Sequence, residues 1–283
     1  MTSMDAIYSF IGTVLPFDWL GPTFMKNALL AVVVAGPLFG MLGTVVVSNR
    51  MAFFSDAIGH SALTGIAIGV LLGIREPTVA MVLFALALGF SIITVKIKGK
   101  SSADTIIGVF SSTAVALGIV LLSATGNFSK YQRYLVGDIL SIRPQEILML
   151  LVSGVLLLVV WIFFYNKMLL TNLHTSFAKS RGVRTFWMEQ VFALLTAAIV
   201  TVSIRWTGLL VINSMLVLPA AASRMVSKSS RSYLLTAVLV SFVSGIAGLC
   251  VSYYIGSASG ATIVLANAAA FALCFVVSLV RKN

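Results

Sequence analysis

One carboxylate and one imidazole lie four residues apart in a stretch that is otherwise apolar or small. Asp56 and His60 belong to the segment Met51-Ala-Phe-Phe-Ser-Asp-Ala-Ile-Gly-His-Ser-Ala-Leu-Thr-Gly65. On an α-helix, residues i and i+4 share a face, so both side chains would point the same way, about one turn apart. Both are ligands for divalent transition metals. The spacing therefore predicts a metal site or, equally, an Asp–His hydrogen bond that only ties two helices together.

The position of Asp56 separates it from the other acidic residues. It is the only one with long apolar sequence on both sides, and we expect it to lie well inside a span. An ionisable group at membrane depth is costly, and it faces a bundle interior or a wet path. The remaining acidic residues fall in loops or at span ends: Asp5, Asp18, Glu76, Asp104, Asp138, Glu146 and Glu189.

The composition excludes a soluble enzyme. Hydrophobic residues make up 59% of the 283 residues and charged residues 10%, and the mean hydropathy is +1.07. A soluble domain usually carries about 25% charged residues. The net charge of +11 comes from short basic clusters between long apolar runs, which is typical of membrane loops. We therefore expect these basic residues to flank membrane spans in a lipid bilayer, and we do not expect the protein to bind nucleic acid.

Apolar runs long enough to cross a bilayer recur along the chain. A bilayer core about 30 Å thick needs roughly 20 apolar residues per helix. We predict an all-α, polytopic membrane helix bundle of about nine transmembrane helices, forming a single transmembrane domain over 1–283. Eight spans remain possible, because the seventh is short and ends on Pro219. Residues 1–22 are predicted to be an interfacial N-terminal segment. The candidate spans are 24–48, 51–73, 77–96, 104–123, 146–165, 186–204, 208–223, 233–255 and 260–280.

The distribution of Lys and Arg predicts which way the spans point. With the N-terminus outside, thirteen of the 19 Lys and Arg residues fall in inner loops and six outside. We therefore expect the N-terminus outside, the C-terminus in the cytoplasm, and the loop 166–185 on the cytoplasmic face. That loop is long and basic and carries a short helical pattern. It is either a surface against which a soluble partner presses or a plain solvated loop.

A second polar pair interrupts the seventh apolar run. Asn213 and Ser214 fall in its middle, and Pro219 frees a backbone carbonyl one turn upstream. Irregular backbone at membrane depth is tolerated where it lines a cavity. Asn213 and Ser214 are therefore candidates for lining a pathway, with a buried interhelical hydrogen bond as the alternative. Asp138, in a long outer loop, is a further pathway candidate.

Motifs of enzymatic catalysis are missing. Gly99-Lys100-Ser101 resembles the end of a nucleotide-binding P-loop, but Thr94 occupies the position where that motif needs a glycine. The sequence also contains no His-Glu-x-x-His and no Gly-x-Ser-x-Gly pattern. We therefore expect a protein that is not itself an enzyme. An intramembrane hydrolase is also not expected, because the sequence lacks the catalytic residue pair that such an enzyme needs.

Five segments, in order, resemble the permeases of the manganese/zinc/iron ABC importer family. The stretch around Asp56 and His60 is similar to the second-helix signature of that family. The other segments that carry the resemblance are Ser102-Ala-Asp104-Thr-Ile-Ile-Gly108, Tyr134-Leu-Val-Gly137-Asp138-Ile-Leu, Phe177-Ala178-Lys-Ser-Arg-Gly182-Val183, and Gly208-Leu-Leu-Val through Pro219-Ala-Ala-Ala.

This resemblance implies the permease subunit of an importer for Mn²⁺, Zn²⁺ or Fe²⁺ in the cell membrane of a prokaryote. It implies a second copy of the chain, a cytoplasmic ABC ATPase dimer and an extracellular or periplasmic metal-binding protein. The metal ion would be the transported substrate, and no cofactor would be bound permanently. Asp56 and His60 of two copies would supply four ligands, and Phe177, Ala178 and Gly182 would belong to the segment that couples to the ATPase. The alternative is a stand-alone secondary transporter or channel for a divalent cation, which would need no ATPase.

Overall fold

The computed structural model describes residues 3–14, 17–74, 76–124, 126, 138–173 and 175–281. The regular structure of these residues is helical, which confirms the predicted all-α class. Most of the segment Tyr134–Leu140 that carried part of the resemblance lies outside the described residues. The helices are α1 (Ser3–Val14), α2 (Thr23–Ser48), α3 (Phe54–Leu71), α4 (Pro77–Lys98), α5 (Ala103–Ala124), α7 (Pro144–Leu173), α8 (Thr175–Ser180), α9 (Thr185–Thr207), α10 (Leu209–Val226), α11 (Ser230–Ile255) and α12 (Ser259–Val280), with the 3₁₀ helices η1 (Asp18–Leu20) and η2 (Ile139–Ser141).

Nine helices of the described residues are long and apolar enough to cross a membrane, as predicted: α2 to α5, α7 and α9 to α12. The largest boundary difference is in the fifth span. The fifth span was expected to end near residue 165, whereas α7 continues to Leu173. The residues beyond 165 include methionine and leucine, which favour helix, and no glycine or proline follows until Gly182. Much of the predicted loop 166–185 is therefore helical, in the end of α7 and in α8.

The expectation that Pro219 ends the seventh span is wrong. α10 runs through Pro219 to Val226. A proline inside a helix cannot donate to the carbonyl four residues earlier, here that of Met215. The hydroxyl of Ser241, on α11, donates to the Met215 carbonyl oxygen at 3.4 Å. The neighbouring helix thus supplies the donor that the proline lacks, and α10 continues.

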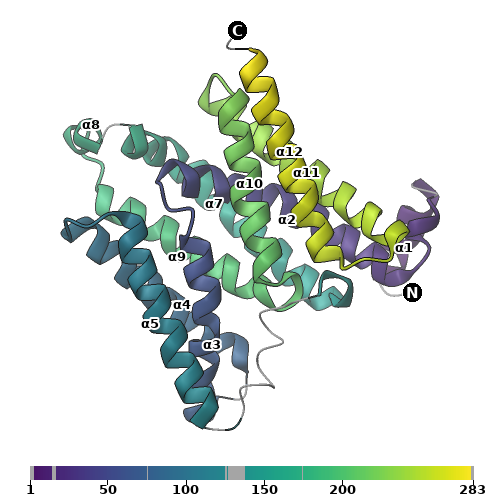
Figure 1. Cartoon of the computed structure of the whole chain (residues 1–283), viewed down its shortest axis with the longest axis horizontal. Helices are drawn as coiled ribbons and strands as arrows, with labels where there is room; N and C mark the ends of the chain where they lie inside the picture. Colours follow the sequence, from purple (N-terminus) through teal and green to yellow (C-terminus); the bar gives the residue numbers. More distant parts are fainter. Residues whose placement is uncertain are drawn as a thin grey trace. The chain divides into compact units, whose positions relative to one another are not determined.

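The helices group into two compact units that interleave in sequence. The first unit comprises Met1–Thr44, Gly137–Gly154 and Trp206–Asn283. Within it α10, α11 and α12 pack against one another (Figure 1). α2 approaches this group through three glycines: a β-carbon added at Gly36 or Gly40 would lie 3.1 Å or 2.9 Å from the α-carbon of an α11 residue. At Gly43 it would overlap the carbonyl oxygen of Leu216 on α10.

The N-terminal segment is tied to this first unit by hydrogen bonds. The Tyr8 hydroxyl, on α1, donates to Asn27 Oδ1 at 2.5 Å. The Asn27 amide in turn donates to the carbonyl oxygen of Ile142 at 3.4 Å, just after η2. Trp19 and Leu20 of η1 are buried. Residues 3–14 and 18–20 of the segment are thus helical and anchored at several points, and the predicted interfacial position stays a prediction.

The second unit comprises Val45–Val136 and Val155–Arg205. In it α3 packs against both α4 and α5 (Figure 1). α9 joins α4 through polar contacts at one end: Lys96 Nζ lies 2.9 Å from Glu189 Oε2, and the Gln190 amide donates to Thr94 Oγ1 at 3.0 Å.

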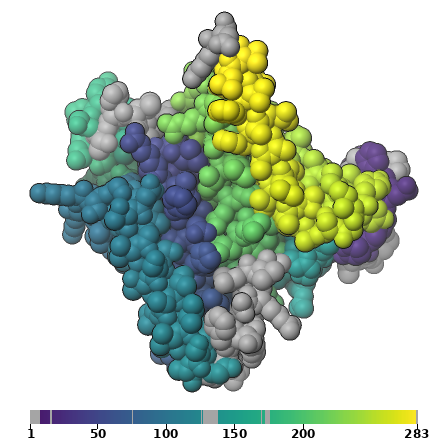
Figure 2. All heavy atoms as spheres, viewed as in Figure 1, coloured from purple at the N-terminus to yellow at the C-terminus, as the bar shows by residue number. Residues whose placement is uncertain are grey.

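Several of the spans carry apolar side chains on their outer faces. α12, yellow in Figure 2, forms a continuous part of the visible surface. Its Leu265, Leu273 and Val280 are exposed, as are Val109 and Val120 of α5. Exposed apolar faces of this extent are typical of helices that contact lipid.

Candidate functional site

The turn between α2 and α3 places Asp56 at the start of a helix. Arg50 adopts a left-handed φ of 55°, and the Met51 amide donates back to the Val46 carbonyl oxygen at 3.0 Å. This turn occupies the residues expected to begin the second span, so α3 starts at Phe54 and Asp56 lies in its first turn. The sequence had suggested a position well inside the span. A carboxylate in a first turn interacts favourably with the helix dipole, a local benefit that His60 does not share.

The structure brings Asp56 and His60 together as the spacing predicted. His60 Nε2 lies 3.5 Å from Asp56 Oδ1, and both side chains are 41% exposed. This distance is long for a charge-assisted hydrogen bond, which is usually below 3 Å. The carboxylate and the imidazole therefore share a face of α3 without a short hydrogen bond between them. Both are exposed enough to contact a bound ion.

The rest of the first half of α3 is buried. Between Phe54 and Ala67, only Asp56 and His60 are not buried. The helix is clamped on its other sides, since Gly65 lies against Met81 of α4 and the Thr64 hydroxyl donates to the Ala114 carbonyl oxygen of α5. The glycines of α3 thus serve helix packing, and the one open strip of this part of the helix carries the two ligand-type side chains.

Among its described residues, a single copy of the chain offers two ligands at this position, Asp56 and His60. No cluster of three or more His, Cys, Asp or Glu side chains suited to a metal ion occurs in the described part of the chain. Structural metal sites in proteins usually have four or more ligands. A metal ion at Asp56 and His60 would need water molecules or another chain to complete its coordination.

Ser214 lies in a buried polar network in the first unit. Asn267 Nδ2, on α12, donates to Ser214 Oγ at 3.1 Å. Ser244 Oγ, on α11, donates to Asn267 Oδ1 at 2.5 Å. Neither Asn267 nor Ser244 was predicted as a site residue, although an asparagine inside the apolar run of the last span is a visible signal. Neighbouring Asn213 is half-buried.

Asp138 performs a local structural task. Its Oδ1 accepts a hydrogen bond from the Leu140 amide at 3.0 Å, which caps η2. Its side chain is exposed, and η2 packs against α12. The pathway roles expected for Asp138, Asn213 and Ser214 stay predictions.

The segment with Phe177, Ala178 and Gly182 forms the short helix α8 and its cap. Ala178 is fully buried, whereas Phe177 is 48% exposed. Gly182 has a φ of 74°, and the Val183 amide donates to the Ala178 carbonyl oxygen at 3.0 Å. This is a left-handed glycine cap, for which glycine is the preferred residue. α8 therefore ends sharply and presents Phe177 at the surface.

Comparison with known proteins identifies the group to which these features belong. The sequence profile of the ABC 3 transport family matches residues 22–279. The chain belongs to the ABC 3 transport family. It is 30% identical over 268 residues to the high-affinity zinc uptake system membrane protein ZnuB of Haemophilus influenzae, covering 94% of this chain and 99% of that one. It is also 30% identical over 257 residues to the manganese import system permease protein ScaB of Streptococcus gordonii, covering 90% and 91%.

A solved structure supports the same assignment for this ABC 3 protein. PsaBC from Streptococcus pneumoniae, in complex with Fab, contains a chain with a TM-score of 0.77 and 26% identity, and the match covers 95% of both chains. The chain is therefore a multi-pass bacterial membrane protein and the permease subunit of an ABC transporter, and it is not the catalytic subunit. A permease of this kind works with ATPase and binding-protein partners. Family membership decides against the stand-alone transporter or channel that the sequence had left open.

Proposed function

We propose that this ABC 3 permease imports Zn²⁺ or Mn²⁺ and that Asp56 and His60 contact the ion in transit. The observation that carries the proposal is the partial exposure of the Asp56 and His60 side chains on a part of α3 whose other residues are buried. The two relatives described above are named for zinc uptake and manganese import. Iron, the third metal expected from the sequence, has no counterpart in those names, so the proposal is restricted to zinc and manganese.

A homodimer would complete the ligand set. Each copy offers one carboxylate and one imidazole, and both side chains are 41% exposed. Two copies meeting along this strip of α3 would provide four N/O ligands and two negative charges. Four such ligands suit Zn²⁺ directly and Mn²⁺ with added water. The metal is cargo in this scheme, so the site must also release it.

The coupling segment would transmit ATP hydrolysis to the bundle. Phe177 presents an exposed aromatic side chain on a short helix with a rigid glycine cap at Gly182. Exposed aromatic side chains on a rigid support are frequent anchors of protein interfaces. In the proposed orientation this segment faces the cytoplasm, where the ATPase lies, and an extracellular binding protein delivers the ion to the opposite face.

The test is metal uptake by Asp56→Asn and His60→Gln at matched expression, in cells lacking the chromosomal gene. Asparagine keeps the shape of Asp56 but removes its charge, and glutamine removes the imidazole nitrogen. We expect both variants to abolish accumulation of zinc or manganese. Glu76→Gln is the matched control, because Glu76 is an exposed carboxylate that makes no capping hydrogen bond. Wild-type uptake by Asp56→Asn and His60→Gln would show that the pair only fixes helix geometry.

A further inference from the structure

A basic cavity lies where α7, α8 and α9 meet, apart from the Asp–His pair. It has a volume of about 530 Å³ and is lined by Lys167, Arg181, Gly182, Val183, Arg184, Trp187 and Met188. Three of these seven residues are cationic and none is acidic. Within the described residues, no carboxylate forms an ion pair with any of the three cations. The cavity therefore carries positive charge that its own chain does not neutralise.

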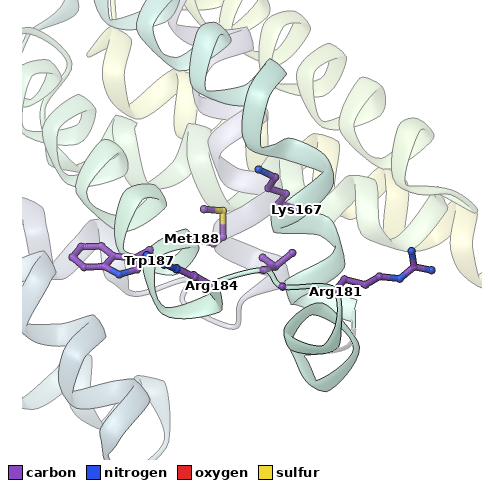
Figure 3. A pocket seen from close by; sticks show the side chains of 7 residues that line it. Lys167, Arg181, Arg184, Trp187 and Met188 are labelled. Carbon is purple, nitrogen blue, oxygen red and sulfur yellow. The ribbon is translucent and has the colours of Figure 1, made fainter.

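The cations do not all point into the same space. Figure 3 shows the Arg181 side chain extending away from the other labelled side chains. Its guanidinium lies 5.2 Å from the centre of the Phe177 ring, which gives it a cation–π partner on α8. Lys167, Arg184, Trp187 and Met188 lie to the left of the Arg181 side chain in that view (Figure 3). The two cations that remain for a bound anion are Arg184 and Lys167, whose Nζ also lies 5.8 Å from the centre of the Phe164 ring on its own helix.

The cavity lies at the level where helix ends meet the membrane surface. The apolar span of α7 ends at Met168, and that of α9 begins at Thr185. These are consecutive spans, so both ends emerge on the same face of the membrane, whichever face that is. Trp187 is 53% exposed, and exposed tryptophans are enriched at this interface level. Lys167 and Arg184 would thus stand at the depth of lipid headgroups.

An apolar strip leads from the bilayer core to the cavity. Leu156, Val159 and Phe163 precede Lys167 on one face of α7 by helical spacing. Their side chains are 53%, 46% and 70% exposed. Acyl chains lying along this strip would bring a headgroup to Lys167. The combination of basic cavity, interfacial tryptophan and apolar strip matches both halves of a phospholipid.

We infer that this cavity binds the headgroup of an anionic phospholipid, with Lys167 and Arg184 contacting its phosphate and the acyl chains lying along α7. Basic pockets between membrane helices recognise anionic headgroups in this way. The inference uses contacts within the second unit only and does not depend on the transported metal or on the orientation of the chain.

The test is lipid retention by the full-length permease in detergent, measured by native mass spectrometry. The probes are dioctanoyl phosphatidylglycerol, dioctanoyl phosphatidylcholine and glycerophosphoglycerol, which has the phosphodiester headgroup and its single negative charge but no acyl chains. We expect wild-type protein to retain phosphatidylglycerol selectively. Lys167→Gln combined with Arg184→Gln should weaken that binding about 30-fold, since each interfacial cation contributes roughly five-fold. Both residues are exposed, and an unchanged melting temperature would verify that the double variant folds.

The matched control is Lys98→Gln combined with Lys100→Gln, which removes two exposed charges outside the cavity and should leave retention unchanged. Equal losses in the two double variants would overturn the inference, and so would equal retention of the two lipids by wild-type protein. If glycerophosphoglycerol competes as well as the lipid, the cavity binds a free anion and not a lipid. Unchanged lipid retention with weaker ATPase binding would assign it to protein docking. None of these outcomes bears on metal uptake.

Discussion

At the scale of single residues, the stability of the protein owes little to the Asp56–His60 pair. Both side chains are 41% exposed, and exposed ion pairs at i,i+4 typically contribute about 0.3–0.5 kcal/mol. Asp56→Asn should therefore change the free energy of unfolding by less than about 1 kcal/mol, while uptake is lost. This contrast separates the proposed metal contact from a structural role. Denaturant unfolding of the purified variants measures the free energy of unfolding, and metal accumulation in cells measures uptake.

The buried network around Asn267 gives the opposite expectation. Its amide donates to Ser214, and its side-chain oxygen accepts from Ser244, so three helices share one polar centre. Asn267→Ala leaves the buried Ser214 hydroxyl without its Asn267 partner, which costs about 1–3 kcal/mol, whereas the Ser244 hydroxyl keeps the Val240 carbonyl oxygen as an acceptor.

We expect a lower melting temperature for Asn267→Ala and uptake per folded molecule close to that of wild-type protein. The conservative variant Ser214→Ala should lose less stability, because it removes one hydrogen bond of the network. Abolished uptake by Ser214→Ala with an unchanged melting temperature would contradict this and return Ser214 to the transport pathway.

At the scale of helices, the contact of α2 with α10 depends on the missing side chain at Gly43. A β-carbon there would overlap the Leu216 carbonyl oxygen, so Gly43→Ala forces the two backbones apart. Overpacking of this kind costs about 1–3 kcal/mol, and we expect a clear loss of thermal stability.

Gly108→Ala is the matched control for Gly43→Ala. Gly108 lies inside α5, and a β-carbon there would meet nothing within 4 Å. Alanine should be neutral or stabilise the helix by about 0.5–1 kcal/mol. Similar melting temperatures for the two variants would mean that α2 and α10 are not held at this distance.

The geometry of α8 determines which coupling variant is informative. Ala178 is fully buried, so a larger residue there disturbs α8 itself. Gly182 has a φ of 74°, so any L-residue strains the cap. Phe177→Ala removes an exposed contact and leaves both features intact.

We expect Phe177→Ala to weaken ATPase association about ten-fold or more, the range for loss of an aromatic anchor, and to lower uptake in parallel. Phe275→Ala removes a phenylalanine of nearly equal exposure on α12 (47% against 48%) and should not affect ATPase binding. Normal ATPase affinity in Phe177→Ala would place the coupling contact elsewhere.

The sequence predicts where the membrane-spanning helices lie along the chain, but it does not predict the contacts between them. Hydropathy located the nine spans because it depends on each segment alone. It missed the passage of α10 through Pro219, because the donor that replaces the lost hydrogen bond is Ser241, on another helix. The i,i+4 spacing predicted that Asp56 and His60 share a face, but the turn that puts Asp56 in the first turn of α3 depends on Arg50. The sequence shows Asn267 as a polar residue in an apolar run, but not its partners Ser214 and Ser244, because they lie on other helices.

At the scale of the whole molecule, the number of spans links the two ends of the chain. If all nine candidate spans of the described residues cross the membrane, the two ends of the chain lie on opposite faces. The Lys and Arg residues then decide which face is which, because cytoplasmic loops are enriched in them. Thirteen of the 19 fall on one side when the spans are taken in order, and that side includes α8.

We therefore expect the C-terminus to lie in the cytoplasm and the N-terminus to lie outside the cell. Reporters fused after Asn283, one active only in the cytoplasm and one only outside, should give activity with the first and none with the second. A fusion after Gly256, in the turn between α11 and α12, should show the reverse, since one span separates the two positions. The same signal at both positions would mean that α12 does not cross the membrane. Inverted signals at both would mean that α8 lies outside, where no cytoplasmic ATPase could reach Phe177, and the coupling proposal would fail with the topology.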